Sequence, residues 1–272
     1  MWHYKLKMSF KLKIISTNLL EEYNSQVDKN LTFNFDSLSN SELSTHNFNF
    51  YTSVSAIASS KIEGETLDID SYVKHKILNI EYQPNLLEKP NDLYNAYVFA
   101  QNNNLTSENF LIAHRILTKH LLPDNKQGIY RKCNMVILEH NTGKIQYEAP
   151  PPNEVEKLMK LLWEDIEELK IKNLNVIEVF YFASYIHLVL VNIHPFEDGN
   201  GRSARLIEKW FLSEKLGKKA WFIQSELYYY KNVNDYYKNL NRLGMFYEQL
   251  DYSKALPFLL MLPNAIKVKS EE

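Results

Sequence analysis

The chain has 272 residues, 45% of them hydrophobic, with 31 Lys and Arg against 33 Asp and Glu. This size suggests one or two domains with a sizeable core, and the balanced charge lacks the basic field of a nucleic-acid-coating protein, so we expect no nucleic-acid partner. A single cysteine, Cys133, excludes an intramolecular disulfide framework and a cysteine-built zinc site.

The first 49 residues carry few clear signals. Lysines interrupt the apolar residues of the basic N-terminus, which therefore does not resemble a signal peptide. No run of about 18 consecutive apolar residues is present, so we expect no membrane span and a cytoplasmic protein. Residues 24–49 mix Asn, Ser and Phe without a period, which predicts a loop-rich connection.

Helical periodicity dominates the rest of the chain and predicts an all-α fold. The stretches concerned are 54–62, 110–120, 155–169, 176–193, 202–216 and 235–243. Residues 155–169 have one apolar face, as expected for a surface helix, whereas 176–193 are apolar all round, as expected for a buried central helix. Gly217 is a plausible left-handed residue at the end of the fifth stretch.

Two β-prone runs, 135–138 and 144–147, flank Asn141-Thr142-Gly143 and predict a hairpin. The three prolines 150–152 are expected to stop the sheet and to prevent a helix from starting there. The tail after Pro263 is expected to fray.

Two of the seven glycines lie one residue apart in HPFEDGNGRSAR, residues 194–205. A helix cannot continue through Pro195 without losing a backbone bond, and glycines permit positive φ, so successive N–H groups can converge on an anion. The next helix adds its free N–H groups and partial positive charge. Arg202 and Arg205, three residues apart, can project from one side of its first turn.

The same segment contains an acid and a base. Asp198 supplies a hard oxygen suited to Mg²⁺ beside phosphates. His194 supplies an imidazole with an ordinary pKa of about 6.5. Each feature alone is ordinary turn chemistry, but their conjunction predicts a phosphate cradle with a metal ligand and a base.

This segment resembles the motif HPFx[D/E]GN[G/K]RxxR of Fic proteins, with every defined position filled. The resemblance implies a Fic/Doc-type helical bundle with a small β-hairpin flap over the active site. We accordingly expect an N-terminal helical region (1–105), a Fic core (106–250) and a C-terminal helical extension and tail (251–272).

The activity implied by the resemblance is protein adenylylation, the transfer of AMP from ATP to a Tyr, Thr or Ser hydroxyl of a target protein or of the chain itself. His194 would be the general base, and Asp198 would hold Mg²⁺. The phosphate ligands would be Gly199, Asn200, Gly201 and Arg202, with Arg205 on the γ-phosphate. Gly201 favours nucleotidyl transfer, because the branch that phosphorylates its targets has lysine at that position.

A second match is Ser59-Ser60-Lys61-Ile62-Glu63-Gly64, which resembles the [S/T]xxxE[G/N] inhibitory motif of Fic proteins. Ser59 and Glu63 would share one face of a helix over about residues 53–64. The resemblance implies that Glu63 pairs with Arg205, displaces it from the γ-phosphate and keeps basal activity low.

The remaining expectations concern partners. The resemblance implies that Ile145 and Tyr147 on the flap hold an extended segment of the target by β-augmentation, with a packing role as the alternative for Tyr147. Tyr236 and Tyr237 would border the adenine, with an ordinary core position as the alternative. A de-AMPylase using the same site, a non-catalytic ATP-binding module and a homodimer stay open.

Overall fold

The computed structural model describes residues 10–38, 45–138 and 143–266. These segments form mostly α-helices and a single two-stranded antiparallel sheet, so the predicted all-α fold with a hairpin is confirmed. The helices are α1 (Leu20–Gln26), α2 (Leu31–Asp36), α3 (Thr45–Ile62), α4 (Ile69–Leu78), α5 (Pro84–Gln101), α6 (Ser107–Leu117), α7 (Pro152–Ile171), α8 (Val176–Ile193), α9 (Asn200–Leu216), α10 (Ser225–Lys231), α11 (Val233–Asn241), α12 (Leu256–Leu259) and α13 (Met261–Asn264). The strands are β1 (Val136–Leu138) and β2 (Ile145–Glu148), and the short 3₁₀ turns are η2 (Asp124–Lys126), η3 (Lys218–Phe222), η4 (Tyr247–Gln249) and η5 (Tyr252–Lys254).

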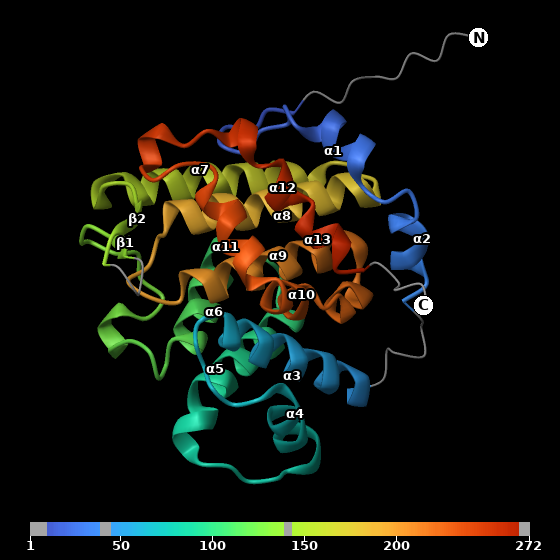
Figure 1. The fold of residues 1–272 in the computed structure, drawn as a ribbon, viewed down its shortest axis with the longest axis vertical. Coiled ribbons are helices and arrows are strands. Elements are labelled where there is room, and N and C mark those ends of the chain that lie inside the picture. The colour runs from blue at the N-terminus through green and yellow to red at the C-terminus, as the bar shows by residue number, and fades with distance from the viewer. Residues whose placement is uncertain (1–9, 39–44, 139–142, 267–272) are drawn as a thin grey trace.

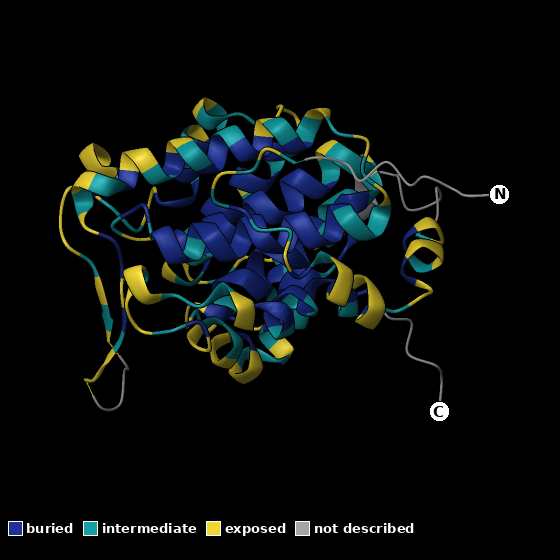
Figure 2. Cartoon of the chain, turned by 90° about the horizontal axis from the view of Figure 1, so that it is seen from above, coloured by how far each residue is buried: buried dark blue, intermediate teal, exposed yellow. Residues whose placement is uncertain are grey.

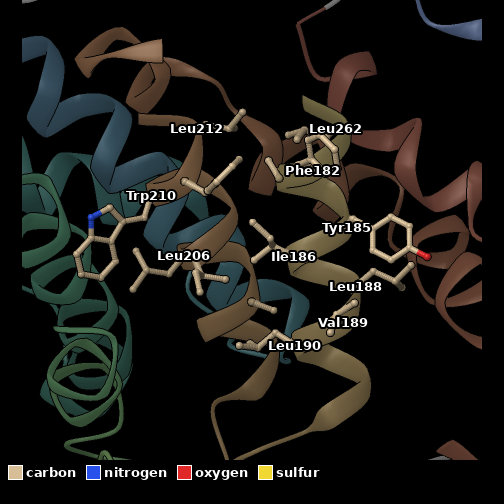
Figure 3. Packing of buried hydrophobic residues seen from close by; sticks show 14 of the residues in the cluster. Phe182, Tyr185, Ile186, Leu188, Val189, Leu190, Leu206, Trp210, Leu212 and Leu262 are labelled. Carbon is tan, nitrogen blue, oxygen red and sulfur yellow. The ribbon is translucent and has the colours of Figure 1, made fainter. Parts of the chain in front are cut away.

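Helix α8 is the centre of the molecule. It packs along α9, with α7 on one side of the pair and α3, α4 and α5 on the other (Figure 1). The interface is filled by side chains such as Ile186 and Leu190 of α8 and Leu206 of α9 (Figure 3), and burial is concentrated there (Figure 2). Because Asn175 and Glu178 form a reciprocal capping box, α8 begins at the predicted residue.

By length and composition α8 could cross a membrane, with a mean hydropathy of 1.8. It is the one such helix in the described part of the chain, and 78% of it is buried inside the protein. A core helix must be apolar on every face, so this composition is explained by packing.

The predicted loop over residues 24–49 is wrong. Helices α1 and α2 occupy part of it and α3 begins at Thr45, while residues 39–44 lie outside the described part of the chain. Aromatic anchors hold these short helices, because Tyr23 contacts Tyr181 edge-on and Phe35 contacts Phe180 in the same way. Such helices are stabilised by tertiary contacts rather than by a long apolar period.

The expectation that the three prolines would prevent a helix is also wrong. Pro151 is the N-cap of α7 and Pro152 is its first residue. The first helical position needs no backbone N–H donor, and the fixed φ of proline suits it, so proline there starts a helix.

The hairpin is present and joined to the rest of the fold. Val136 pairs with Glu148 and Ile137 with Tyr147, with an irregularity before Leu138. Gly143 has a φ of +66°, whereas Asn141 and Thr142 of the predicted turn lie outside the described residues.

Buried side chains from all three predicted regions belong to one hydrophobic cluster. Tyr23 and Tyr97 come from the N-terminal region, Phe196 from the core and Leu262 from the C-terminal extension. The division into these regions stays a prediction.

Candidate active site

The turn between α8 and α9 has an unusual backbone. His194 adopts the left-handed conformation, with φ 51° and ψ 59°, and Gly199 does so just before α9 with φ 79°. A Cβ at Gly199 would lie 2.9 Å from Thr118 Cγ2, so both conformation and space require glycine there. A non-glycine residue in this conformation, as at His194, is often a functional residue.

The Asn200 side chain closes this turn. Its Oδ1 accepts the N–H of Phe196 at 2.9 Å, and its Nδ2 donates to the Phe196 carbonyl at 2.9 Å. Asn200 is buried, so its amide shapes the loop, and its contribution to binding an anion would come from the backbone N–H at the start of α9.

His114 of α6 contacts the turn between α8 and α9. Its Nδ1 accepts the N–H of Gly128 at 2.8 Å, so Nε2 donates to the Asp198 carbonyl at 3.0 Å. Its ring stacks on Phe196 with centroids 3.5 Å apart, and burial lowers the pKa of His114 to about 4. The spacing of His114 in the sequence gives no signal of its contact with residues 196–198.

Arg131 connects the turn that follows α8 to the residues on either side of the hairpin. Its guanidinium donates to the carbonyls of His194 at 2.7 Å, Cys133 at 2.8 Å and Pro150 at 2.7 Å. Its backbone N–H donates to the Pro195 carbonyl at 2.9 Å. The position of His194 is therefore fixed from both sides.

His194 is half-buried and lines a cavity of about 260 Å³. Its Nδ1 lies 3.3 Å from the Val191 carbonyl, which can only accept, so Nδ1 carries the proton and Nε2 keeps a lone pair. Burial lowers the pKa of His194 to about 4, which keeps the imidazole neutral near pH 7. This is the protonation state that a general base needs.

The cavity brings together many of the predicted site residues. Those that line it are Glu63, Tyr147, His194, Gly201, Arg205, Tyr236 and Tyr237. The exposed Asp198 lies outside that lining, and its Oδ1 accepts the N–H of Gly199 at 2.6 Å.

Arg205 and Glu63 form an ion pair in this cavity. Arg205 Nη2 lies 2.6 Å from Glu63 Oε1, and the Arg205 side chain is wholly buried. Ser59 also binds the guanidinium, because its Oγ accepts from Nε at 2.8 Å and its carbonyl accepts from Nη2 at 3.2 Å. Burial acts to raise the pKa of Glu63, but the charges of Arg205 and Arg202 outweigh it and hold the pKa below its ordinary value.

Gly201 leaves room for this pair. It lies within α9, and a Cβ there would be 2.4 Å from Glu63 Oε1. Any side chain at position 201 would therefore force Glu63 to move. Gly64, the last residue of the proposed inhibitory motif, follows Glu63 after the end of α3 and has a φ of +92°.

A second acidic residue lies beside the other motif arginine. Arg202 is 3% exposed, and its guanidinium lies 3.5 Å from Glu65, which also pairs with Lys89 at 3.0 Å. Arg202 Nε has no hydrogen-bond partner among the described residues. A buried donor without a partner is expected to bind an anion or water.

The four residues assigned to adenine and target contacts differ in exposure. Tyr236 is buried and Tyr237 is 37% exposed, its hydroxyl donating to the Ile62 carbonyl at 3.2 Å. Tyr147 is 7% exposed and donates to the Asn192 carbonyl, which favours the packing alternative, whereas Ile145 is 43% exposed on the hairpin.

The donor set fits a magnesium ion held chiefly by its substrate. No three His, Cys, Asp or Glu side chains gather into a metal site in the described part of the chain. Mg²⁺ usually takes one or two carboxylates together with substrate phosphates and waters, and Asp198 on the turn between α8 and α9 offers one such carboxylate.

Comparison with known proteins agrees with this geometry. Over 150 residues the chain is 29% identical to a protein named protein adenylyltransferase Fic from Nematostella vectensis, covering 54% of this chain and 31% of that protein. Over 104 residues it is 31% identical to a uridine 5′-monophosphate transferase from Xanthomonas campestris pv. campestris, covering 35% of this chain and 19% of that protein. The matches thus span less than a third of either relative.

A crystal structure of a Fic family protein from Desulfovibrio desulfuricans has the same fold. Its TM-score is 0.72 at 22% identity, with 92% of this chain and 72% of that chain covered. Residues 104–212, which contain the motif, match the Fic/DOC family. With the motif on the turn between α8 and α9 and the Fic fold around it, residues 104–212 of the chain form a Fic/DOC family domain.

Proposed function

We propose that this protein is a nucleotidyltransferase that moves AMP from ATP to a hydroxyl side chain of a target protein and that Glu63 keeps it nearly inactive. The observation that carries the proposal is the cavity that a neutral His194 and the buried Arg205 both line. A base and a buried cation on one cavity suit the transfer of a phosphoryl-type group.

In the proposed reaction the target hydroxyl oxygen attacks the α-phosphorus of ATP. His194 Nε2 accepts the hydroxyl proton, an O–P bond forms, and the bond to the bridging oxygen of the β-phosphate breaks. Pyrophosphate leaves with the electron pair of that bond. The tautomer of His194 supports this role, because its Nδ1 proton is held by Val191.

The chain's remaining contribution would be positioning and charge compensation. The first N–H groups of α9, Arg202 and Arg205 would bind the phosphates, and the unpartnered Nε of Arg202 supports an anion there. Mg²⁺ held by Asp198 and the phosphates would compensate negative charge on the departing pyrophosphate. The exposed hairpin residue Ile145 is the proposed contact for an extended target segment.

The proposed inhibition follows from competition for Arg205. The guanidinium already has the Glu63 carboxylate at 2.6 Å, and an ATP γ-phosphate would need the same donors. Loss of the Glu63 carboxylate would free these donors and enlarge the cavity.

The nucleotide is proposed to be ATP, as in the adenylyltransferase relative, with UTP as the alternative suggested by the uridine 5′-monophosphate transferase. Radiolabelled ATP and UTP, each labelled at the α-phosphate, distinguish the two. We expect label from ATP in the chain itself or in lysate proteins.

The test compares wild type, Glu63→Gly and Glu63→Gly/His194→Ala. Glu63→Gly is expected to raise incorporation at least tenfold, which is the factor for about 1.4 kcal/mol of relieved competition. The double variant should incorporate no label while still binding ATP. Equal incorporation by wild type and Glu63→Gly would refute the inhibition, and ATP binding without transfer by Glu63→Gly would favour a binding module.

Removal of AMP from a modified protein is a second candidate. It is favoured by the position of Glu63, whose side chain is 29% exposed in the cavity that His194 lines, where a carboxylate could orient a water. An AMP-modified target incubated with wild type would then release free AMP, and Glu63→Gly would abolish the release.

A further inference from the structure

Among the described residues, Arg205 has one side-chain hydrogen-bond partner besides Ser59 and Glu63 of the proposed inhibitory segment. Three of its four side-chain hydrogen bonds go to Ser59 and Glu63, and the fourth goes from Nη1 to the Tyr236 hydroxyl at 3.3 Å. If Glu63 withdraws, the two contacts to Ser59 and the contact to the Tyr236 hydroxyl remain, and Tyr236 is the one on the α11 side of the guanidinium. What holds the Tyr236 hydroxyl therefore influences where Arg205 lies when nucleotide binds.

The Tyr236 hydroxyl lies between Arg205 and His187 of α8. The distance from its oxygen to His187 Nε2 is 2.9 Å. A guanidinium only donates, so the Tyr236 oxygen accepts from Arg205, and its own hydrogen needs an acceptor. Among the hydrogen bonds of the described residues, His187 Nε2 is the acceptor that this hydroxyl has.

This assignment fixes the tautomer of His187. With Nε2 as the acceptor, the ring proton is on Nδ1, which donates to Glu208 Oε2 at 2.7 Å. The Tyr229 hydroxyl donates to the same carboxylate oxygen at 2.9 Å. His187 and Glu208 are both wholly buried, so neither contact is exposed to bulk solvent.

Arg205 thus donates to Tyr236, Tyr236 donates to His187, and His187 donates to Glu208; these four residues are called the relay here. Arg205 and Glu208 both belong to α9, so the relay begins and ends on the helix that carries the motif. Buried chains of this kind hold their members in one arrangement, because any break leaves a polar group unpaired.

We propose that His187 is a positioning residue for nucleotide binding: it orients the Tyr236 hydroxyl so that its oxygen holds Arg205 toward the γ-phosphate once Glu63 has withdrawn. The inference rests on the proposed function, since it assumes that Arg205 binds the γ-phosphate. His187 itself does not touch the nucleotide.

The substitutions are made in the Glu63→Gly chain, here called the parent. His187→Leu removes the acceptor, whereas His187→Gln keeps an acceptor oxygen near the position of Nε2. Tyr236→Phe removes the hydroxyl itself. Tyr97→Phe is the matched control, because it removes a buried hydroxyl that donates to Glu226 and lies outside the relay.

The measurement is the dissociation constant of a non-hydrolysable ATP analogue and of ADP by calorimetry. His187→Leu and Tyr236→Phe are expected to weaken binding of the analogue about tenfold and to leave binding of ADP, which has no γ-phosphate, unchanged. His187→Gln should restore most of the loss, and the His187→Leu/Tyr236→Phe double variant should bind no more weakly than either single variant. Tyr97→Phe should bind both nucleotides as the parent does.

The outcomes separate this inference from the function on which it rests. A parent that binds the analogue no better than ADP refutes the γ-phosphate role of Arg205 and with it the positioning role of His187, whereas the proposed transfer itself is refuted by a parent that incorporates no AMP label. A parent that prefers the analogue, together with unchanged binding by Tyr236→Phe and His187→Leu, refutes the positioning role alone. Equally weakened binding of both nucleotides, or losses of affinity that add up in the double variant, also overturns the positioning role. Thermal unfolding of each variant identifies losses of affinity that are due to misfolding.

Discussion

At the scale of single residues, backbone and burial set the chemistry of His194. The left-handed turn places its ring in the cavity, Val191 holds its Nδ1 proton, and burial lowers the pKa to about 4. The motif alone predicts an imidazole of ordinary pKa, which would be partly protonated near pH 6.5. The structure therefore changes the expected pH dependence of the proposed reaction.

A base acts only when it is unprotonated, so its rate falls as the pH drops through its pKa. With a pKa of about 4 for His194, the rate of AMP incorporation by Glu63→Gly should stay level between about pH 6 and 8. Removing Glu63 reinforces this expectation, because its negative charge raises the pKa of His194. Initial rates at saturating ATP test it, and a midpoint between pH 6 and 7 would contradict it.

At this scale, contacts between residues that lie close together in the chain are the predictable ones. His194 and Arg205 are part of one segment, so their proximity follows from a single turn and the start of a helix. His114 and His187 were not assigned to the site, because α6 and α8 bring them to the turn and to Tyr236 only by packing. A lone histidine in an apolar stretch has no local signal of such a partner.

At the scale of elements, helix α3 brings the proposed inhibitory residues to α9. It packs against α4, α5 and α10 as well as α9, so Ser59 and Glu63 are held from several sides. The match to the inhibitory motif predicted a helix over about residues 53–64, and the structure has a longer one that begins at Thr45 and ends at Ile62. Glu63 then lies at the end of the helix, beside the cavity.

Ser59 is expected to strengthen the proposed lock. Ser59→Ala removes the hydroxyl that accepts from Arg205 Nε at 2.8 Å but keeps the carbonyl contact. The Ser59 carbonyl and the Glu63 carboxylate would still hold the guanidinium, so the change should raise incorporation of label only several-fold, to a level below that of Glu63→Gly. Quantified autoradiography of the two variants with wild type measures this order.

Ser60→Ala is the matched control, because its Oγ has no hydrogen-bond partner among the described residues. It should leave incorporation at the wild-type level. Activity of Ser59→Ala equal to that of wild type would mean that Glu63 alone holds Arg205.

At the scale of the whole molecule, a buried ionic cluster joins four helices. Lys209 of α9 pairs with Glu226 of α10, both wholly buried, and donates to Ser55 of α3 at 2.7 Å. Tyr97 of α5 donates to the other oxygen of Glu226 at 2.6 Å. The cluster thus connects α3, which positions Ser59 and Glu63, to α9, which carries the motif, through the protein interior.

Breaking this cluster should cost stability. Lys209→Met leaves Glu226 buried without its cation, and removal of one partner of a buried pair typically costs about 3–5 kcal/mol. Urea unfolding followed by circular dichroism should show a lower midpoint, partly recovered in Lys209→Met/Glu226→Gln. The exposed pair of Lys74 and Asp70 gives the control, since Lys74→Met should leave the midpoint unchanged. A midpoint for Lys209→Met equal to that of Lys74→Met would show that the cluster does not support the fold.

The sequence by itself determined the features that arise from neighbouring residues: the central helix α8, the hairpin runs and the motif turn between α8 and α9. Each depends on a local period, on turn chemistry or on residues adjacent in the chain. It did not determine α1 and α2, which are held by aromatic contacts with α8, or the start of α7 at Pro152. Only the tertiary structure decided that His114 supports the loop, that Gly201 leaves room for Glu63 and that His187 reaches Tyr236, because each is a contact between elements far apart in the chain.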